Sequence, residues 1–152
     1  MTRKQVVREL SFFFNVKEFF CPHIVERFGE SAWNFPDIRL LETVLWIRKT
    51  LAKPMMINSQ QLGLTERGMR CNLCNEVKKH DTAYLSAHVL GQGVDFTVTG
   101  MTATQVRKWI DDHKDDLPHK IRLERKSNGK EISWVHLDVR NEGVDKIVYF
   151  NA

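Results

Sequence analysis

Two apolar, strand-like segments of the chain carry histidine and aspartate side chains that could bind a metal ion. The first runs from Ser86 to Asp95, with His88 and Asp95 on either side of two glycines, and the second, residues 133–139, contains His136. A buried carboxylate costs several kcal/mol unless a partner or a metal takes its charge. Two imidazoles and one carboxylate suit an open zinc site, which leaves a fourth position for water. The pattern therefore favours a metal site over isolated core or surface histidines.

The rest of the chain supplies the elements that must position these side chains. Apolar periodicity predicts a helix over residues 37–51, and a capping box predicts a second helix over residues 102–114. Asn128-Gly129 is typical of a hairpin turn. We expect strands at residues 55–57, 84–89, 94–98, 121–125, 131–139 and 144–150. This order predicts an α+β fold, a mostly antiparallel sheet with flanking helices, as one domain over residues 1–152.

Composition and charge exclude several classes of protein. The net charge of +4 is mild and spread along the 152 residues, so it does not demand a nucleic-acid partner. No stretch approaches the roughly 20 apolar residues of a membrane span. Three cysteines, Cys21, Cys71 and Cys74, argue against a disulfide framework. Arg8 and Glu9 interrupt the N-terminal apolar run, so we expect synthesis in the cytoplasm without a signal peptide.

Three other features have competing interpretations. Cys71-x-x-Cys74, with His88 further along, could form a structural zinc or DNA-binding module or a redox pair, but no second histidine follows at finger spacing. The basic residues 120–130 fit the solvated face of a hairpin better than a phosphate-binding surface. The aromatic residues between positions 12 and 35 are expected to pack into the core rather than form a binding surface.

The two histidine segments resemble the zinc D-alanyl-D-alanine carboxypeptidase family, which includes bacterial murein peptidases, phage endolysins and the hedgehog signalling domain. Residues 86–95 have the order Ser-x-His-x-x-Gly-x-x-x-Asp, and residues 134–138 have the order Trp-x-His-x-Asp. Residues 16–21, 52–58 and 66–70 are similar to the family's upstream segments. The resemblance covers about residues 14–140 and implies a fold of the hedgehog and DD-peptidase type.

The resemblance implies a zinc ion bound by His88, Asp95 and His136, with the fourth position open to water. It also implies cleavage of an amide bond in peptidoglycan stem peptides or at their D-alanine termini. Arg70 matches the family's substrate-side arginine, and a guanidinium fits a substrate carboxylate or a developing oxyanion. Ser86 is expected to orient a neighbouring residue of the site.

The sequence departs from the family's pattern at two positions. Gly93 stands where the family usually has alanine. Ser133 stands three residues before His136, where members commonly have an acidic general base, and serine cannot accept a proton at neutral pH. Glu131 is therefore our first candidate for the base, while Asp138 shares a strand face with His136 and is expected to orient it.

These observations predict a zinc metallopeptidase, a carboxypeptidase or endopeptidase that acts on bacterial cell-wall peptides. The alternative is a catalytically impaired zinc-binding domain that binds the cell wall or a protein partner. We expect a monomer without nucleic-acid or membrane partners. A protein of this kind fits a phage or prophage lysis enzyme, an endolysin, which reaches the wall through a holin-type pore or as part of a virion.

Overall fold

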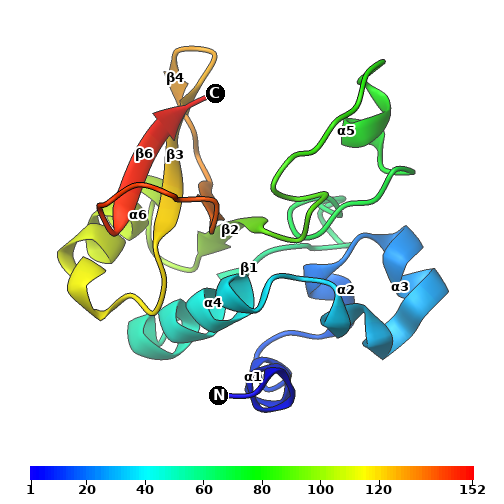
Figure 1. The fold of residues 1–152 in the computed structure, drawn as a ribbon, viewed down its shortest axis with the longest axis horizontal. Coiled ribbons are helices and arrows are strands. Elements are labelled where there is room, and N and C mark those ends of the chain that lie inside the picture. The colour runs from blue at the N-terminus through cyan, green and yellow to red at the C-terminus, as the bar shows by residue number, and fades with distance from the viewer.

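The computed structural model describes residues 1–152 and confirms the α+β prediction. The helices are α1 (Arg3–Leu10), α2 (Val16–Phe19), α3 (Pro22–Phe28), α4 (Ile38–Leu51), α5 (Asn75–Lys78) and α6 (Ala103–Asp112), with 3-10 turns η1 (Gly29–Asn34) and η2 (Lys114–Asp116). The strands are β1 (Met55–Met56), β2 (Gly93–Val98), β3 (Ile121–Ser127), β4 (Lys130–Glu131), β5 (Val135–Asp138) and β6 (Ile147–Asn151). Figure 1 shows the strands on one side of the molecule and α2, α3 and α5 on the other.

The sheet brings the metal-binding candidates together through its register. Its strand order is β1-β2-β5-β3-β4, with β6 added parallel to β3 and all other pairs antiparallel. Asp95 on β2 lies directly opposite His136 on β5, and Asp138 on β5 lies opposite Arg122 on β3. Directly opposed residues share a face of the sheet. Four polar side chains from three strands therefore converge on one face.

The two predicted long helices form for the reasons that the sequence indicates. Asp37 caps α4 by accepting a hydrogen bond from the backbone N–H of Arg39, and Ala52 ends the helix in a left-handed conformation with φ 54°. Thr102 and Gln105 form the predicted capping box at the start of α6. None of the helices is both long and apolar enough to cross a membrane.

The predicted strand over residues 84–89 is wrong, because this segment forms a turn that presents His88. Ser86 accepts hydrogen bonds at its side chain from the N–H of Val89 and at its carbonyl from the N–H of Leu90. Gly91 adopts φ 65°, a conformation that favours glycine. These local bonds replace the ladder of a strand. His88 thus comes from a loop, whereas Asp95 and His136 come from the sheet.

The N-terminal aromatic residues form part of the core, as expected for most of them. Phe19, Phe20 and Trp33 are buried, and their ring centroids lie 5.0–5.4 Å apart. Phe12, Phe28 and Phe35 are exceptions with exposed side chains. This aromatic cluster supports the segment from Phe19 to Cys21, which pairs with residues 68–70 next to the site.

The structure explains why Gly93 stands where the related pattern has alanine. A Cβ atom at Gly93 would lie 2.7 Å from the Cβ of Ala87 and 3.3 Å from the Cβ of Asp138. We expect Gly93→Ala to lower the free energy of unfolding by about 1–3 kcal/mol, measured by urea denaturation at a fixed zinc concentration. Adding Ala87→Gly should recover much of this loss. Equal stability of Gly93→Ala and the natural chain would contradict the close packing at this point.

Candidate functional site

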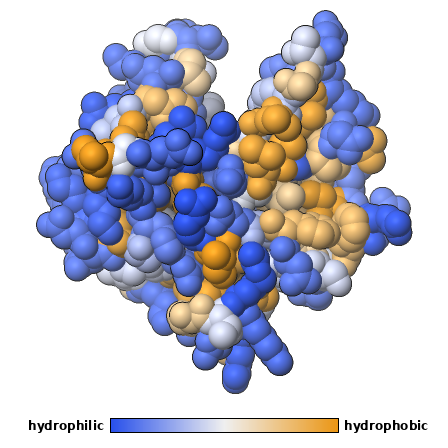
Figure 2. Space-filling model, viewed as in Figure 1, coloured by the Kyte–Doolittle hydropathy of each residue, from blue (hydrophilic) through white to orange (hydrophobic).

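The candidate site is a cavity of about 350 Å³ between the sheet and the loop over residues 70–88. This volume is within the range of small-ligand pockets. Figure 2 shows a notch in the surface between the strands and the part that carries α5, with apolar side chains on the α5 side. His88, Asp95 and His136 line the cavity together with Arg70. Four of the five predicted site residues therefore lie in one place.

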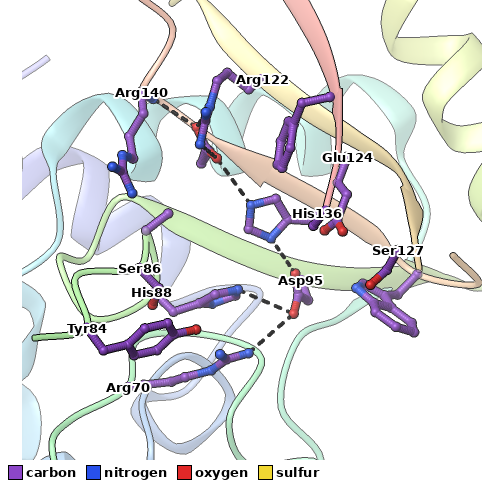
Figure 3. A pocket seen from close by; sticks show the side chains of 15 residues that line it. Arg70, Tyr84, Ser86, His88, Asp95, Arg122, Glu124, Ser127, His136 and Arg140 are labelled. Atoms are coloured by element: carbon purple, nitrogen blue, oxygen red, sulfur yellow. Dashed lines mark hydrogen bonds and ion pairs between the residues drawn. The ribbon is translucent and has the colours of Figure 1, made fainter. Parts of the chain in front are cut away.

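The three predicted metal ligands form one buried group (Figure 3). The Asp95 carboxylate lies between the two imidazoles: its Oδ1 is 2.7 Å from His136 Nδ1, and its Oδ2 is 3.4 Å from His88 Nε2. The exposed fractions of His88, Asp95 and His136 are 4%, 8% and 8%. Their ligand atoms all lie within 4.8 Å of one another. This group could hold a metal ion.

The outer nitrogens of both imidazoles are held by acceptors. His88 Nδ1 lies 2.9 Å from the carbonyl oxygen of Gly68, and His136 Nε2 lies 3.2 Å from Asp138 Oδ2. A carbonyl or an ionised carboxylate can only accept, so both of these ring nitrogens donate. The remaining nitrogen of each ring faces Asp95. Metal-binding histidines usually have this arrangement, with one nitrogen on the metal and the other N–H on a fixed acceptor.

Asp138 is the best-anchored polar side chain of the site. Arg122 donates two hydrogen bonds of 2.8 Å to its two oxygens, and the backbone N–H of Arg140 donates a third of 3.0 Å. Burial alone would raise the pKa of Asp138, but the hydrogen bonds from His136, Arg122 and Arg140 lower it to about 2. Asp138 is therefore ionised and fixed, and it contacts His136 as the strand alternation predicted.

The two buried carboxylates need positive charge between them. Burial disfavours the charged form of His136, yet hydrogen bonds to Asp138 and Asp95 raise its pKa to about 9. Burial also opposes ionisation of Asp95, but the charge of His88 and hydrogen bonds from His136 hold the pKa of Asp95 far below its usual range. Without a metal, a proton on His136 Nδ1 supplies this charge. A metal ion bound there must displace that proton.

Arg70 lies at the edge of the metal-binding group. Its guanidinium is 3.6 Å from Asp95 Oδ2, and its Nε–H donates to the carbonyl oxygen of Glu66. The side chain is largely buried, and it lines the cavity as predicted for a substrate-binding arginine. The carbonyl oxygen of Glu66 therefore fixes the guanidinium, which can contact a ligand bound in the cavity.

Glu131, our first candidate for the general base, does not line the cavity. Its side chain is 58% exposed, accepts a 3.1 Å bond from Arg107 and also accepts a bond from Thr104. Arg107 in addition donates to the carbonyl oxygen of Trp134. Glu131 thus helps to fasten residues 131–134 to α6. The prediction that Glu131 is the base does not fit this position.

Glu124 on β3 is the carboxylate that does line the cavity. Arg122 pairs with Asp138, and Glu124, two residues further along β3, presents its side chain to the same face of the sheet as Arg122. Asp95, His136 and Glu124 thus lie on one face of the sheet, on β2, β5 and β3 (Figure 3). Burial raises the pKa of Glu124.

The cysteines do not meet His88. Cys71 and Cys74 instead lie with Cys21 and His23, and the ligand atoms of these four residues are within 4.8 Å of one another. The chain therefore contains two separate groups of side chains that could hold a metal ion. The sequence analysis did not connect Cys21-x-His23 with Cys71-x-x-Cys74, because the two motifs lie about 50 residues apart.

Comparisons with protein-family models, with curated proteins and with solved structures find no match for this chain.

Proposed function

We propose that the chain is a zinc-dependent peptidase that hydrolyses amide bonds in the stem peptides of bacterial peptidoglycan. The proposal combines the resemblance of its two histidine segments to the D-alanyl-D-alanine carboxypeptidase and endolysin family with the geometry of the site. The observation that carries it is the orientation of His88 and His136: each has one nitrogen fixed by an acceptor and the other turned to Asp95. The site of action is the bacterial cell wall, after release from the cytoplasm or as part of a virion.

The donor set fits zinc. Two imidazole nitrogens and one carboxylate are ligands of catalytic zinc sites, and hard cations such as calcium or magnesium prefer oxygen ligands alone. Asp138 and the carbonyl of Gly68 hold the outer nitrogens of the two rings. When bound, zinc polarises a carbonyl and makes water a nucleophile at neutral pH. The three ligands lie in the cavity wall, so one side of the group faces the space for a substrate.

Glu124 has the position and the protonation behaviour of a general base. It lies on the same face of the sheet as His136 and Asp95, and it lines the cavity with them. A raised pKa brings a carboxylate closer to the operating pH, which favours proton transfer. Glu124 accepts the proton of the attacking water at its carboxylate and returns it to the nitrogen of the leaving amine.

Three guanidinium groups around the cavity favour a substrate with carboxylates. Arg70 and Arg122 are held against Asp95 and Asp138, and Arg140 is an exposed residue whose guanidinium donates to the carbonyl of Leu85. Tyr84, Trp134 and Phe150 add aromatic surface to the walls of the cavity. Stem peptides carry free carboxylates at their D-alanine ends and along the chain, so an arginine-lined cavity suits them.

The alternative, a zinc domain that binds the wall without cutting it, derives from Ser133 at the position of the family's acidic base and from the engagement of Glu131 with Arg107. Digestion of purified peptidoglycan with zinc-loaded protein, read by mass spectrometry, separates the two. We expect new peptide termini that disappear on chelation. An intact wall, with zinc bound and the protein retained on the wall, would overturn the peptidase and favour the binding domain.

A further inference from the structure

The second group of metal-binding side chains lies where the N-terminal helices meet the loop that leads to α5. Cys21 precedes the first turn of α3, and His23 lies in that turn. Cys71 and Cys74 come from the loop, and Cys74 precedes α5. The four residues are distant in sequence but adjacent in space because Cys21 donates its backbone N–H to the carbonyl of Met69 at 3.0 Å.

The distances among three members of this group are close to those of a tetrahedral metal site, and Cys21 Sγ lies within 4.8 Å of the other three ligand atoms. His23 Nδ1 is 3.6 Å from Cys71 Sγ and 3.8 Å from Cys74 Sγ, and the two sulfurs are 4.0 Å apart. A tetrahedral zinc with bonds of about 2.3 Å to sulfur and about 2.0 Å to nitrogen separates its ligand atoms by roughly 3.5–3.8 Å. The two sulfurs are too far apart for a disulfide, whose bond is about 2.05 Å.

Backbone N–H groups donate to two of the sulfurs and offset part of the burial that raises the pKa of the Cys74 thiol. The N–H of Cys71 donates to Cys74 Sγ and the N–H of Leu73 donates to Cys71 Sγ, both at 3.4 Å. Donors of this kind favour the thiolate, the form of cysteine that binds metals. A tight turn between Cys71 and Cys74 produces this geometry, with the N–H of Cys74 on the carbonyl of Cys71 at 3.1 Å.

We infer that Cys21, His23, Cys71 and Cys74 bind a second zinc ion with a structural role. Three thiolates and one imidazole fill all four positions of a tetrahedral ion, as in structural zinc sites, and leave none for a substrate. Thiolate ligands also select zinc over magnesium or calcium. The group at His88, Asp95 and His136 has only three protein ligands and faces the cavity.

The position of this second site indicates what the ion would stabilise. Between β1 and β2 the chain runs from residue 57 to residue 92 with α5 as its only helix and no strand. This span contains Arg70, which immediately precedes Cys71, and it forms one wall of the cavity. A metal ion bound by Cys71 and Cys74 would link residues 57–92 to the start of α3 and so stabilise a span that has little regular secondary structure. The second ion would therefore hold Arg70 and the cavity wall in place.

The test is the metal content of the full chain, purified under reducing conditions without chelators. Elemental analysis should find two zinc ions per chain. The double variant Cys71→Ser/Cys74→Ser should retain one, and His88→Ala/His136→Ala should also retain one. His80→Ala, which changes an exposed histidine stacked on Tyr84, is the matched control and should retain two.

Replacement of zinc by cobalt in the natural chain identifies the ligands without relying on the cysteine variants, which could fail to fold. The natural chain loaded with cobalt should show a thiolate-to-metal absorption band in the near ultraviolet, and His23→Cys should retain the band because cysteine can replace the imidazole. Loss of zinc from this site should lower the thermal midpoint by roughly 5–10 °C. The inference would be overturned if the natural chain and the Cys71→Ser/Cys74→Ser variant both contained one zinc ion per chain. A cobalt-loaded natural chain without thiolate absorption would also overturn it. Neither measurement requires hydrolysis, so failure of the peptidase proposal would leave this result intact.

Discussion

Glu124→Gln should abolish amide hydrolysis while zinc binding and the fold are retained. Glutamine preserves the size of the side chain but cannot accept a proton. Loss of a general base typically costs a factor of about 10²–10⁴ in rate. Because Glu124 belongs to the cavity wall and not to the group of metal ligands, the zinc content should not change. Release of peptide termini from peptidoglycan, measured over time at equal zinc loading, gives the rate.

Glu131→Gln is the matched control for this experiment. Glu131 is exposed and does not line the cavity, so its replacement by the amide of the same size should leave the rate within about twofold. The opposite result, with Glu131→Gln inactive and Glu124→Gln active, would restore the base suggested by the sequence. If both variants remain active, neither carboxylate is the base.

The metal-binding group could be predicted from the sequence because each ligand lies in a recognisable local pattern. His88 and Asp95 are separated by glycines that permit a turn, and Asp95 and His136 interrupt apolar segments where a charge needs a partner. These signals depend only on neighbouring residues. They identify the three residues that the structure groups together, even though the predicted strand around His88 is a turn.

Glu124 could not be predicted, because its position depends on an irregularity in the hairpin. At the turn, Lys126 pairs with Glu131, whereas further along Arg122 pairs with Asp138. The pairing has therefore shifted by three residues, and a shift by an odd number moves side chains to the opposite face. In the regular hairpin expected from Asn128-Gly129, Glu124 would face away from His136. Arg107 supports the irregular segment by binding the carbonyl of Trp134.

The second metal-binding group was missed for a different reason. The pair Cys71 and Cys74 was visible in the sequence, but its partners, Cys21 and His23, lie about 50 residues earlier. The pairing of residues 19–21 with Met69 brings the two segments together. The sequence instead suggested His88 as a partner, which the structure assigns to the other group. Long-range pairing of this kind has no local signal.

His88→Ala and His136→Ala should each abolish hydrolysis and remove one zinc ion per chain. Both histidines offer a ring nitrogen to the space beside Asp95, so either change leaves only two ligands there. The variants should differ in stability when metal is absent. His136 lies between Asp95 and Asp138, and breaking a buried ion pair of this kind costs about 3–5 kcal/mol, whereas His88 has a looser 3.4 Å contact with Asp95. Urea denaturation in excess chelator measures the difference.

The control for these variants is His113→Ala. His113 follows the last residue of α6, and its ring hydrogen-bonds to the carbonyl oxygen of Trp109. This control variant should keep both the zinc content and the rate of the natural chain. Hydrolysis that survives His136→Ala would contradict a catalytic role for this group. If both variants lose zinc and the natural chain leaves peptidoglycan intact, the metal serves binding and not hydrolysis. The combination of the two histidine variants with Glu124→Gln therefore separates a metal that positions the wall peptide from one that takes part in cutting it.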